Sequence, residues 1–259
     1  MDRLSLELDV GLADGYKSPS QRARRITEGW YAEHMYCVAC PSPHLDRTRE
    51  NTRVVDFVCG SCGAEYQVTA KAGALAARLR DAAYAPMMER ALANRSPHFA
   101  FLGYDNAAWC VQNLLLVPGH FITSEVIERC RPLSPTARRA GWEGCNILTY
   151  RIPSDGRLAA VENGRVVPPA KVRAGFQRFA DLAQARPEAR GWTVDVLRCV
   201  RALGGREFTL AEFYERFEEK LGARHPANRN IQPKIRQQLQ VLRDRGVLRF
   251  LARGRYVTE

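Results

Sequence analysis

The stretch that decides the fold is Asp56-Phe-Val-Cys59-Gly-Ser-Cys62-Gly-Ala-Glu65-Tyr-Gln-Val-Thr69. A second cysteine pair, Cys37-Val-Ala-Cys40, precedes it, with 18 residues between Cys40 and Cys59. Each Cys-x-x-Cys turn can direct two thiolates at one ion, so two such turns are typical of a tetrahedral zinc site. We therefore predict one structural zinc ion held by Cys37, Cys40, Cys59 and Cys62.

An isolated acid and a short alternating segment lie on either side of the second cysteine pair. Asp56 comes just before the pair, and residues 65–69 alternate in polarity and predict a strand. An acid followed by a strand is the outline of a metal-dependent nuclease core. The acid-x-lysine that usually completes such a core is absent from its expected positions, where this chain has Gln67-Val-Thr69.

The composition favours an intracellular protein with a polyanionic partner. The 259 residues carry a net charge of +11, which favours nucleic acid as the binding partner. A membrane span is not expected, because no apolar run approaches the ~20 residues that a bilayer requires. The N-terminus has no hydrophobic signal core, so we expect a cytoplasmic protein, in which cysteines stay reduced. We also expect it to act as a monomer.

Hydrophobic periodicity predicts a mixed α/β unit over residues 1–186. Ser20 is a candidate N-cap for a first helix within residues 16–31. The alanine-rich segment 73–94 predicts one or two further helices, and 168–182 predicts an amphipathic helix. The predicted strands are 53–58, 65–69, 99–104, 113–117 and 147–150.

Residues 187–259 predict a separate winged-helix unit. Pro187-Glu-Ala-Arg-Gly191 has the composition of a linker. Three helices follow, over 193–203, 210–221 with Thr209 as the cap, and 232–245. Gly246 ends the third helix, and 247–257 predicts a strand, a turn and a second strand. Three helices before a two-stranded wing are the order of a winged helix-turn-helix.

The third helix of this unit has an apolar face and a basic face. Ile235, Leu239 and Leu242 follow the spacing of a core stripe. Arginine pairs with guanine and glutamine with adenine in the major groove, so the other face is a candidate base reader. The candidate DNA-binding residues are Lys234, Arg236, Gln237, Gln240 and Arg243 on the helix, and Arg249, Arg253 and Arg255 on the wing.

Several segments resemble the DpnI-type methyl-directed restriction endonucleases. Besides the cysteine pairs, they are Tyr16-Lys-Ser-Pro-Ser-Gln21, Asp81-Ala-Ala-Tyr-Ala-Pro-Met-Met88, Pro132-Leu-Ser-Pro-Thr-Ala-Arg-Arg-Ala-Gly-Trp-Glu-Gly-Cys-Asn146 and Ile235-Arg-Gln-Gln-Leu-Gln-Val-Leu-Arg-Asp244. The resemblance spans nearly the whole chain. It implies a PD-(D/E)xK nuclease domain with an embedded zinc site, followed by a winged helix. It also implies Mg²⁺-dependent cleavage of both strands of duplex GATC that carries N6-methyladenine, recognised by both domains.

The resemblance assigns roles to matching residues. The four cysteines match the zinc ligands, and Asp56 matches the metal-binding aspartate. Trp142 matches a tryptophan in a loop that enters the DNA, which makes its neighbours Arg138 and Arg139 candidate DNA contacts as well.

The departure from the family lies at Gln67 and Thr69, where family members have acid-x-lysine. Gln67 can still offer Mg²⁺ one neutral oxygen, but Thr69 cannot replace an ammonium. Residues 65, 67, 69 and 71 share one face of an ideal strand, so Glu65 could supply the carboxylate and Lys71 the ammonium, displaced by ~6.6 Å along the strand. Alternatively, Glu65 is merely exposed and Lys71 binds a DNA phosphate.

The sequence leaves three functions open. The first is a Mg²⁺-dependent endonuclease for adenine-methylated GATC, with a structural zinc ion. The second is a catalytically impaired reader of the same methylated DNA, suggested by Gln67 and Thr69. The third is a zinc-containing transcription regulator, which leaves Asp56 and the Trp142 loop without a role.

Overall fold

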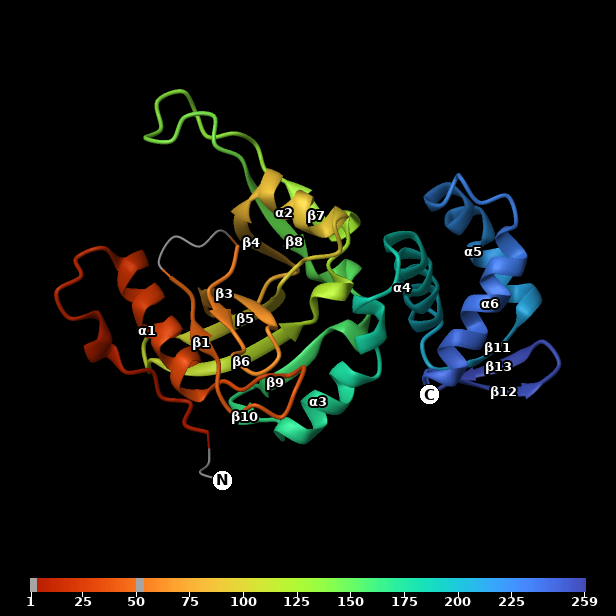
Figure 1. Ribbon diagram of the computed structural model, residues 1–259, viewed down its shortest axis with the longest axis horizontal. Coiled ribbons are helices and arrows are strands. Elements are labelled where there is room, and N and C mark those ends of the chain that lie inside the picture. Colours follow the sequence, from red (N-terminus) through yellow and green to blue (C-terminus); the bar gives the residue numbers. More distant parts are fainter. Residues whose placement is uncertain (1–3, 50–53) are drawn as a thin grey trace. The chain divides into compact units, whose positions relative to one another are not determined.

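Two apolar strands, β5 (His98–Asp105) and β6 (Cys110–Val117), form the centre of the first of two structural units. The computed structural model describes residues 4–49 and 54–259, and its first unit ends at Ala183 while the second begins at Gln184 (Figure 1). Each unit has its own core and is described by itself. In the described ranges, no helix is both long enough and apolar enough to span a membrane.

The first unit is built on a seven-stranded sheet with the order β1-β2-β3-β5-β6-β9-β10. The remaining strands are β1 (Asp46–Arg47), β2 (Phe57–Val58), β3 (Glu65–Ala72), β9 (Leu158–Glu162) and β10 (Arg165–Val166). Only β3 and β5 pair in parallel, and the other neighbours are antiparallel. The strands predicted over 65–69, 99–104 and 113–117 are confirmed. The strand predicted over 53–58 is shorter, and residues 50–53 lie outside the described residues.

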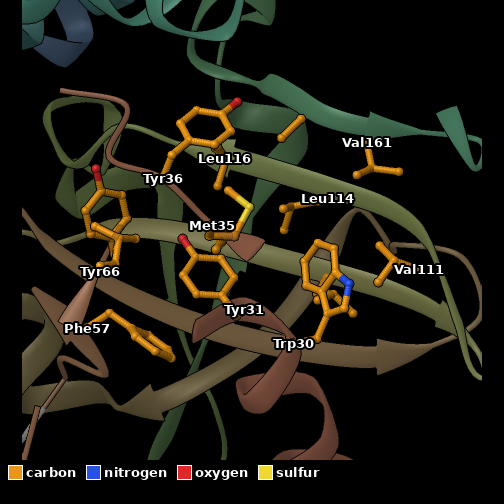
Figure 2. Close-up of a cluster of buried hydrophobic side chains, with 14 of the residues drawn as sticks. Trp30, Tyr31, Met35, Tyr36, Phe57, Tyr66, Val111, Leu114, Leu116 and Val161 are labelled. Carbon is orange, nitrogen blue, oxygen red and sulfur yellow. The ribbon is translucent and has the colours of Figure 1, made fainter. Parts of the chain in front are cut away.

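One face of this sheet carries the main core. Helices α1 (Pro19–His34) and α3 (Pro169–Gln177) both contribute side chains to it, and Figure 2 shows Trp30 and Tyr31 of α1 against the strands. Tyr66 of β3 is also fully buried in this cluster. Burying each large side chain of this kind stabilises the fold by roughly 1.5–3 kcal/mol.

A second sheet, with the order β4-β8-β7, completes the first unit together with helix α2 (Tyr84–Leu92). Its strands are β4 (Arg78–Ala83), β7 (Ile127–Arg129) and β8 (Gly144–Leu148). The prediction of helix over 73–94 is wrong for its first half. Buried Leu79 of β4 pairs with buried Ile147 of β8, and this tertiary pairing overrides the helical propensity of the alanine-rich segment.

Short helical turns connect these elements. They are η1 (Val10–Ala13), η2 (Gly119–Phe121), η3 (Ser124–Val126), η4 (Thr149–Arg151), η5 (Ser154–Gly156) and η6 (Ala180–Ala183). The predicted helix over 168–182 is therefore α3 followed by η6. The prediction of Ser20 as the N-cap of α1 is wrong, because the helix begins at Pro19 and Ser18 is the N-cap. Proline suits this first position because its fixed φ is helical and it has no N–H to satisfy.

The second unit consists of three helices and a three-stranded sheet. Its elements are α4 (Pro187–Arg201), β11 (Glu207–Thr209), α5 (Leu210–Arg224), α6 (Ile231–Asp244), β12 (Leu248–Ala252) and β13 (Arg255–Thr258), with the sheet order β11-β13-β12. The prediction of a linker over 187–191 is wrong, since these residues form the first turn of α4, with Pro187 at its first position. The wing strands are confirmed, and β11 adds a third strand that is not predicted from the sequence.

The predicted core stripe of α6 is confirmed. Ile235, Leu239 and Leu242 are each fully buried. Gly246 follows the helix with φ of +67°, a left-handed conformation that suits glycine and ends the helix as predicted.

A capping box starts α5, as the sequence predicts for Thr209. The Thr209 hydroxyl accepts from the N–H of Glu212 at 3.2 Å, and the Glu212 carboxylate accepts from the N–H of Thr209 at 2.6 Å. Both N–H groups at the start of the helix are thereby satisfied.

We expect Thr209→Ala to lower the free energy of unfolding of the second unit by about 1 kcal/mol, because Glu212 loses the acceptor for its N–H. The measurement is denaturant unfolding followed by circular dichroism. Ser18→Ala is the matched control, since Ser18 is an N-cap whose side chain makes no capping bond. An equal loss in both variants would contradict the assignment of the cap.

Candidate functional site

The four predicted zinc ligands lie together. Their sulfur atoms all fall within 4.8 Å of one another, with 3.6 Å between Cys37 and Cys62 and 3.6 Å between Cys40 and Cys59. Zinc–sulfur bonds of ~2.3 Å in a tetrahedron place the sulfurs about 3.8 Å apart. The spacing and the thiolate chemistry of this cluster therefore fit a zinc ion.

The cysteine cluster is joined to β3 through Tyr66. The Tyr66 hydroxyl accepts from the N–H of Val38 at 3.0 Å and lies 3.2 Å from the sulfur of Cys37. On α3, Arg173 donates to the carbonyl oxygens of Cys37 and Ser42 at 2.9 and 3.1 Å. A change in the geometry of the cysteine cluster would therefore displace β3, the strand that carries Gln67 and Thr69.

Asp56 is fixed at an edge of β3. Its N–H donates to the carbonyl of Tyr66 at 2.8 Å, and its carboxylate accepts from the N–H of Val68 at 2.9 Å. The pairing of β2 with β3 ends at Phe57, so the carboxylate satisfies an N–H that no neighbouring residue of β2 reaches. This places one acid beside the strand residues Gln67 and Thr69.

Two opposing influences act on the Asp56 carboxylate. The net effect is a raised pKa, because burial and the charge of Glu28 raise it by more than the bond from Val68 and the charge of Arg24 lower it. The guanidinium of Arg24 on α1 lies 4.0 Å from the other carboxylate oxygen. The side chain remains 24% exposed, so a ligand can approach it.

Gln67 and Thr69 point to the face of β3 opposite Tyr66, and both contact a third acid. The amide nitrogen of Gln67 donates to the carboxylate of Asp81 at 2.7 Å, and the Thr69 hydroxyl donates to the same oxygen at 3.1 Å. Asp81 belongs to β4. Burial raises its pKa to about 7, an effect that the charge of Asp56 reinforces and the bond from Thr69 opposes.

Sequence reasoning did not single out Asp81 as a site residue. The signal available was its place in the segment Asp81-Ala-Ala-Tyr-Ala-Pro-Met-Met88, which carries part of the family resemblance. That segment was predicted to be helical, and a helix gave no reason to place Asp81 against β3. Its pairing as a strand is what brings it there.

Glu65 and Lys71 occupy the ends of the same strand. The Glu65 carboxylate forms an ion pair with Arg90 of α2 at 2.5 Å, and Glu65 is 42% exposed at its side chain. Lys71 is exposed near the end of β3. Glu65 is therefore already neutralised by a cation, whereas Asp56, Gln67, Thr69 and Asp81 form the closer group.

The loop between β7 and β8 carries Arg138, Arg139 and Trp142. It extends away from the sheets of its own unit (Figure 1). At its base, the N–H of Leu133 donates to the carbonyl of Trp142 at 2.9 Å. The Arg139 guanidinium lies over the half-buried Trp142 ring, 5.0 Å from its centre. Arg138 and Arg139 are exposed, so the loop presents positive charge beside an aromatic ring.

The Trp142 ring also depends on a glycine two residues later. A Cβ at Gly144 would lie 2.9 Å from the Trp142 ring, a distance that real Cβ contacts do not reach. Glycine at 144 is thus what lets the ring rest against the start of β8.

On α6, the predicted base-reading face is exposed. Arg236, Gln237, Gln240 and Arg243 all lie at the surface, and the half-buried Lys234 donates to Gln237 at 2.9 Å. The Arg243 guanidinium lies 4.7 Å from the centre of the Phe250 ring, which connects the helix to wing strand β12. The exposure and chemistry of this face suit a helix that enters a major groove.

The wing arginines are exposed as well. Arg255 forms an ion pair with Glu207 of β11 at 3.0 Å, and Arg249 forms one with Glu259 at 3.1 Å. Arg253 lies between β12 and β13, at the turn of the wing. Exposed pairs of this kind are weak, so these cations remain available to a phosphate.

Comparison with protein families matches both units. Residues 4–185 match the family described as DpnI, the Dam-replacing family, and residues 188–258 match the Dam-replacing HTH domain. The two matches together cover nearly the whole chain. A helix-turn-helix domain in a restriction endonuclease family points to DNA binding, in agreement with the basic charge of +11.

We expect the purified chain to contain one zinc ion and Cys59→Ser to lose it. The loss should lower the free energy of unfolding of the first unit by on the order of 4 kcal/mol, because a structural zinc ion contributes directly to folding. Metal analysis and thermal unfolding provide the measurements. Cys130→Ser is the control, since Cys130 lies outside the cluster. Full stability without zinc would contradict a structural role.

Proposed function

The chain belongs to the DpnI, or Dam-replacing, family, and on that premise we propose that it is a methyl-directed DNA endonuclease. Its substrate is duplex DNA with N6-methyladenine in GATC, and its reaction is Mg²⁺-dependent hydrolysis of the phosphodiester bond. The observation that carries the proposal is the position of Asp56, whose carboxylate is held on β3 next to Gln67 and Thr69. In this view the first unit is a PD-(D/E)xK core.

The residues beside Asp56 fit a hard cation. Asp56 offers a charged oxygen and Gln67 offers a neutral one, which are the donors that Mg²⁺ prefers. When bound there, Mg²⁺ would activate water and offset the charge that develops on the phosphate. Asp56 would orient that cation through its fixed bond to Val68. Arg24 adds positive charge on the α1 side of the same carboxylate.

DNA binding is divided between the two units. In the first unit, Arg138, Arg139 and Trp142 form a basic and aromatic loop suited to phosphates and to insertion between base steps. In the second unit, α6 would read the major groove and the wing arginines would contact the backbone. The preference for a methyl group rests on the family alone.

A second function is favoured by one specific observation. Gln67 and Thr69 stand where the family has acid-x-lysine, and both side chains are engaged with Asp81. A chain that retains the DNA-binding surfaces but lacks the acid and the ammonium would bind methylated GATC without cutting it. This alternative is an impaired reader of adenine-methylated DNA.

Plasmid digestion separates the two functions. With Mg²⁺ or Mn²⁺ we expect the wild-type chain to cut adenine-methylated plasmid, to leave unmethylated plasmid intact, and to lose activity in Asp56→Ala because the fixed carboxylate is removed. If the wild type and Asp56→Ala both leave each plasmid intact, the endonuclease proposal fails.

The reader alternative makes its own demand on the same assay. It requires that the wild-type protein bind methylated DNA tightly without cutting it. The double variant Gln67→Glu with Thr69→Lys should then begin to cut this DNA. Equal affinity for methylated and unmethylated duplex would contradict methyl recognition in both functions.

We expect Trp142→Ala to weaken binding to methylated duplex and to slow cutting, with little change in the melting temperature. The reason is that the ring belongs to a loop that projects from its unit (Figure 1). Fluorescence anisotropy and thermal unfolding provide the two readouts. Tyr150→Ala removes an exposed aromatic ring from the neighbouring turn η4 and serves as the control. A large drop in melting temperature for Trp142→Ala would instead indicate a packing role.

A further inference from the structure

A carboxylate that no family role accounts for faces the altered positions of β3. One oxygen of Asp81 accepts from both Gln67 and Thr69, at 2.7 and 3.1 Å. These are the two positions at which the family's acid and lysine are missing. Asp81 reaches them from β4, a strand of the second sheet, so the contact arises from tertiary packing.

Two oxygen atoms of this group have no hydrogen-bond donor among the described residues. They are the second carboxylate oxygen of Asp81 and the side-chain oxygen of Gln67, and both atoms are buried. Gln67 as a whole is only 7% exposed. A buried oxygen without a hydrogen-bond partner lowers the stability of the fold by roughly 1–3 kcal/mol. A ligand that coordinates both oxygens, such as a cation, would offset this cost.

Asp56 belongs to the same group. Phe57 pairs with Tyr66, so Asp56, one residue earlier, lies opposite Gln67 in the same register. Residues that lie opposite each other in an antiparallel pair have Cβ atoms about 5 Å apart. The charge of Asp56 also acts on Asp81. Two carboxylates that repel each other, together with one neutral amide oxygen, form a ligand set for a divalent cation that prefers oxygen.

We infer that Asp81 is the second metal-binding carboxylate of this chain, sharing one divalent cation with Asp56 and Gln67. The inference deepens the proposed function and rests on it only for the use of the cation in hydrolysis. Family members carry the second carboxylate on the strand that corresponds to β3. In this chain, Asp81 supplies it from β4, a strand of the other sheet. Glu65, held by Arg90, is not needed for this role.

The test is calorimetric titration of Mn²⁺ into the full-length, zinc-loaded chain without DNA. The wild type should bind one Mn²⁺ beyond its zinc, and Asp81→Asn should weaken that binding tenfold or more. Asparagine is isosteric and keeps an acceptor for Gln67 and Thr69, so the fold should persist. Asp81→Ser is a second variant that removes the same charge with less volume. Zinc content and melting temperature are measured for each variant.

Glu65→Gln is the matched control, because it removes a carboxylate from the same face of β3 outside the proposed ligand set. It should bind Mn²⁺ as the wild type does. Failure of the wild type to bind Mn²⁺, or wild-type affinity in a folded Asp81 variant, would overturn the inference. Loss of binding in Glu65→Gln alone would assign the second carboxylate to Glu65 and overturn it equally.

The titration also separates this inference from the endonuclease proposal. Binding that depends on Asp81 in a chain that cuts no DNA would support the metal site while the nuclease proposal fails. If the chain cuts DNA but its Mn²⁺ affinity does not depend on Asp81, the nuclease proposal is supported and the metal-site inference fails.

Discussion

The candidate active centre depends on the two hydrogen bonds that fix Asp56 to the open edge of β3. Tyr66 and Val68 offer a carbonyl and an N–H there, and Asp56 uses both. These bonds fix the direction of the carboxylate. They do so although Asp56 lies outside β2, which contains only Phe57 and Val58. A carboxylate that accepts one backbone bond, on a residue whose own N–H makes a second, can serve a metal with little cost of ordering.

The cysteine cluster supports that interaction through Tyr66. Tyr66 lies with its hydroxyl against Cys37 and its carbonyl on the N–H of Asp56. We propose no role for the thiolates in hydrolysis. Their contribution is to hold the strand on which Gln67 and Thr69 face Asp81. Because α3 also binds this cluster through Arg173, the support extends into the core of the first unit.

Much of this arrangement could be predicted from local patterns. Cysteine spacing gave the cluster, and alternation placed Gln67 and Thr69 on one face of β3. Asp81 could not be predicted, since the strand that carries it forms only by pairing with β8. Pro187 and Gly191 likewise have the composition of a loop, yet they form the start of α4, whose Trp192 is fully buried. In both segments, tertiary packing overrides local propensity.

We propose that Asp56 holds a hydrolytic metal centre although acid-x-lysine is missing. The most direct test of this proposal is the single-turnover rate of strand cleavage in a short duplex with one fully methylated GATC, measured against Mg²⁺ concentration. We expect a rate that saturates with Mg²⁺ and falls about a hundredfold or more in Asp56→Asn, because several kcal/mol of metal-supplied stabilisation are lost. An identical rate in wild type and Asp56→Asn would contradict it.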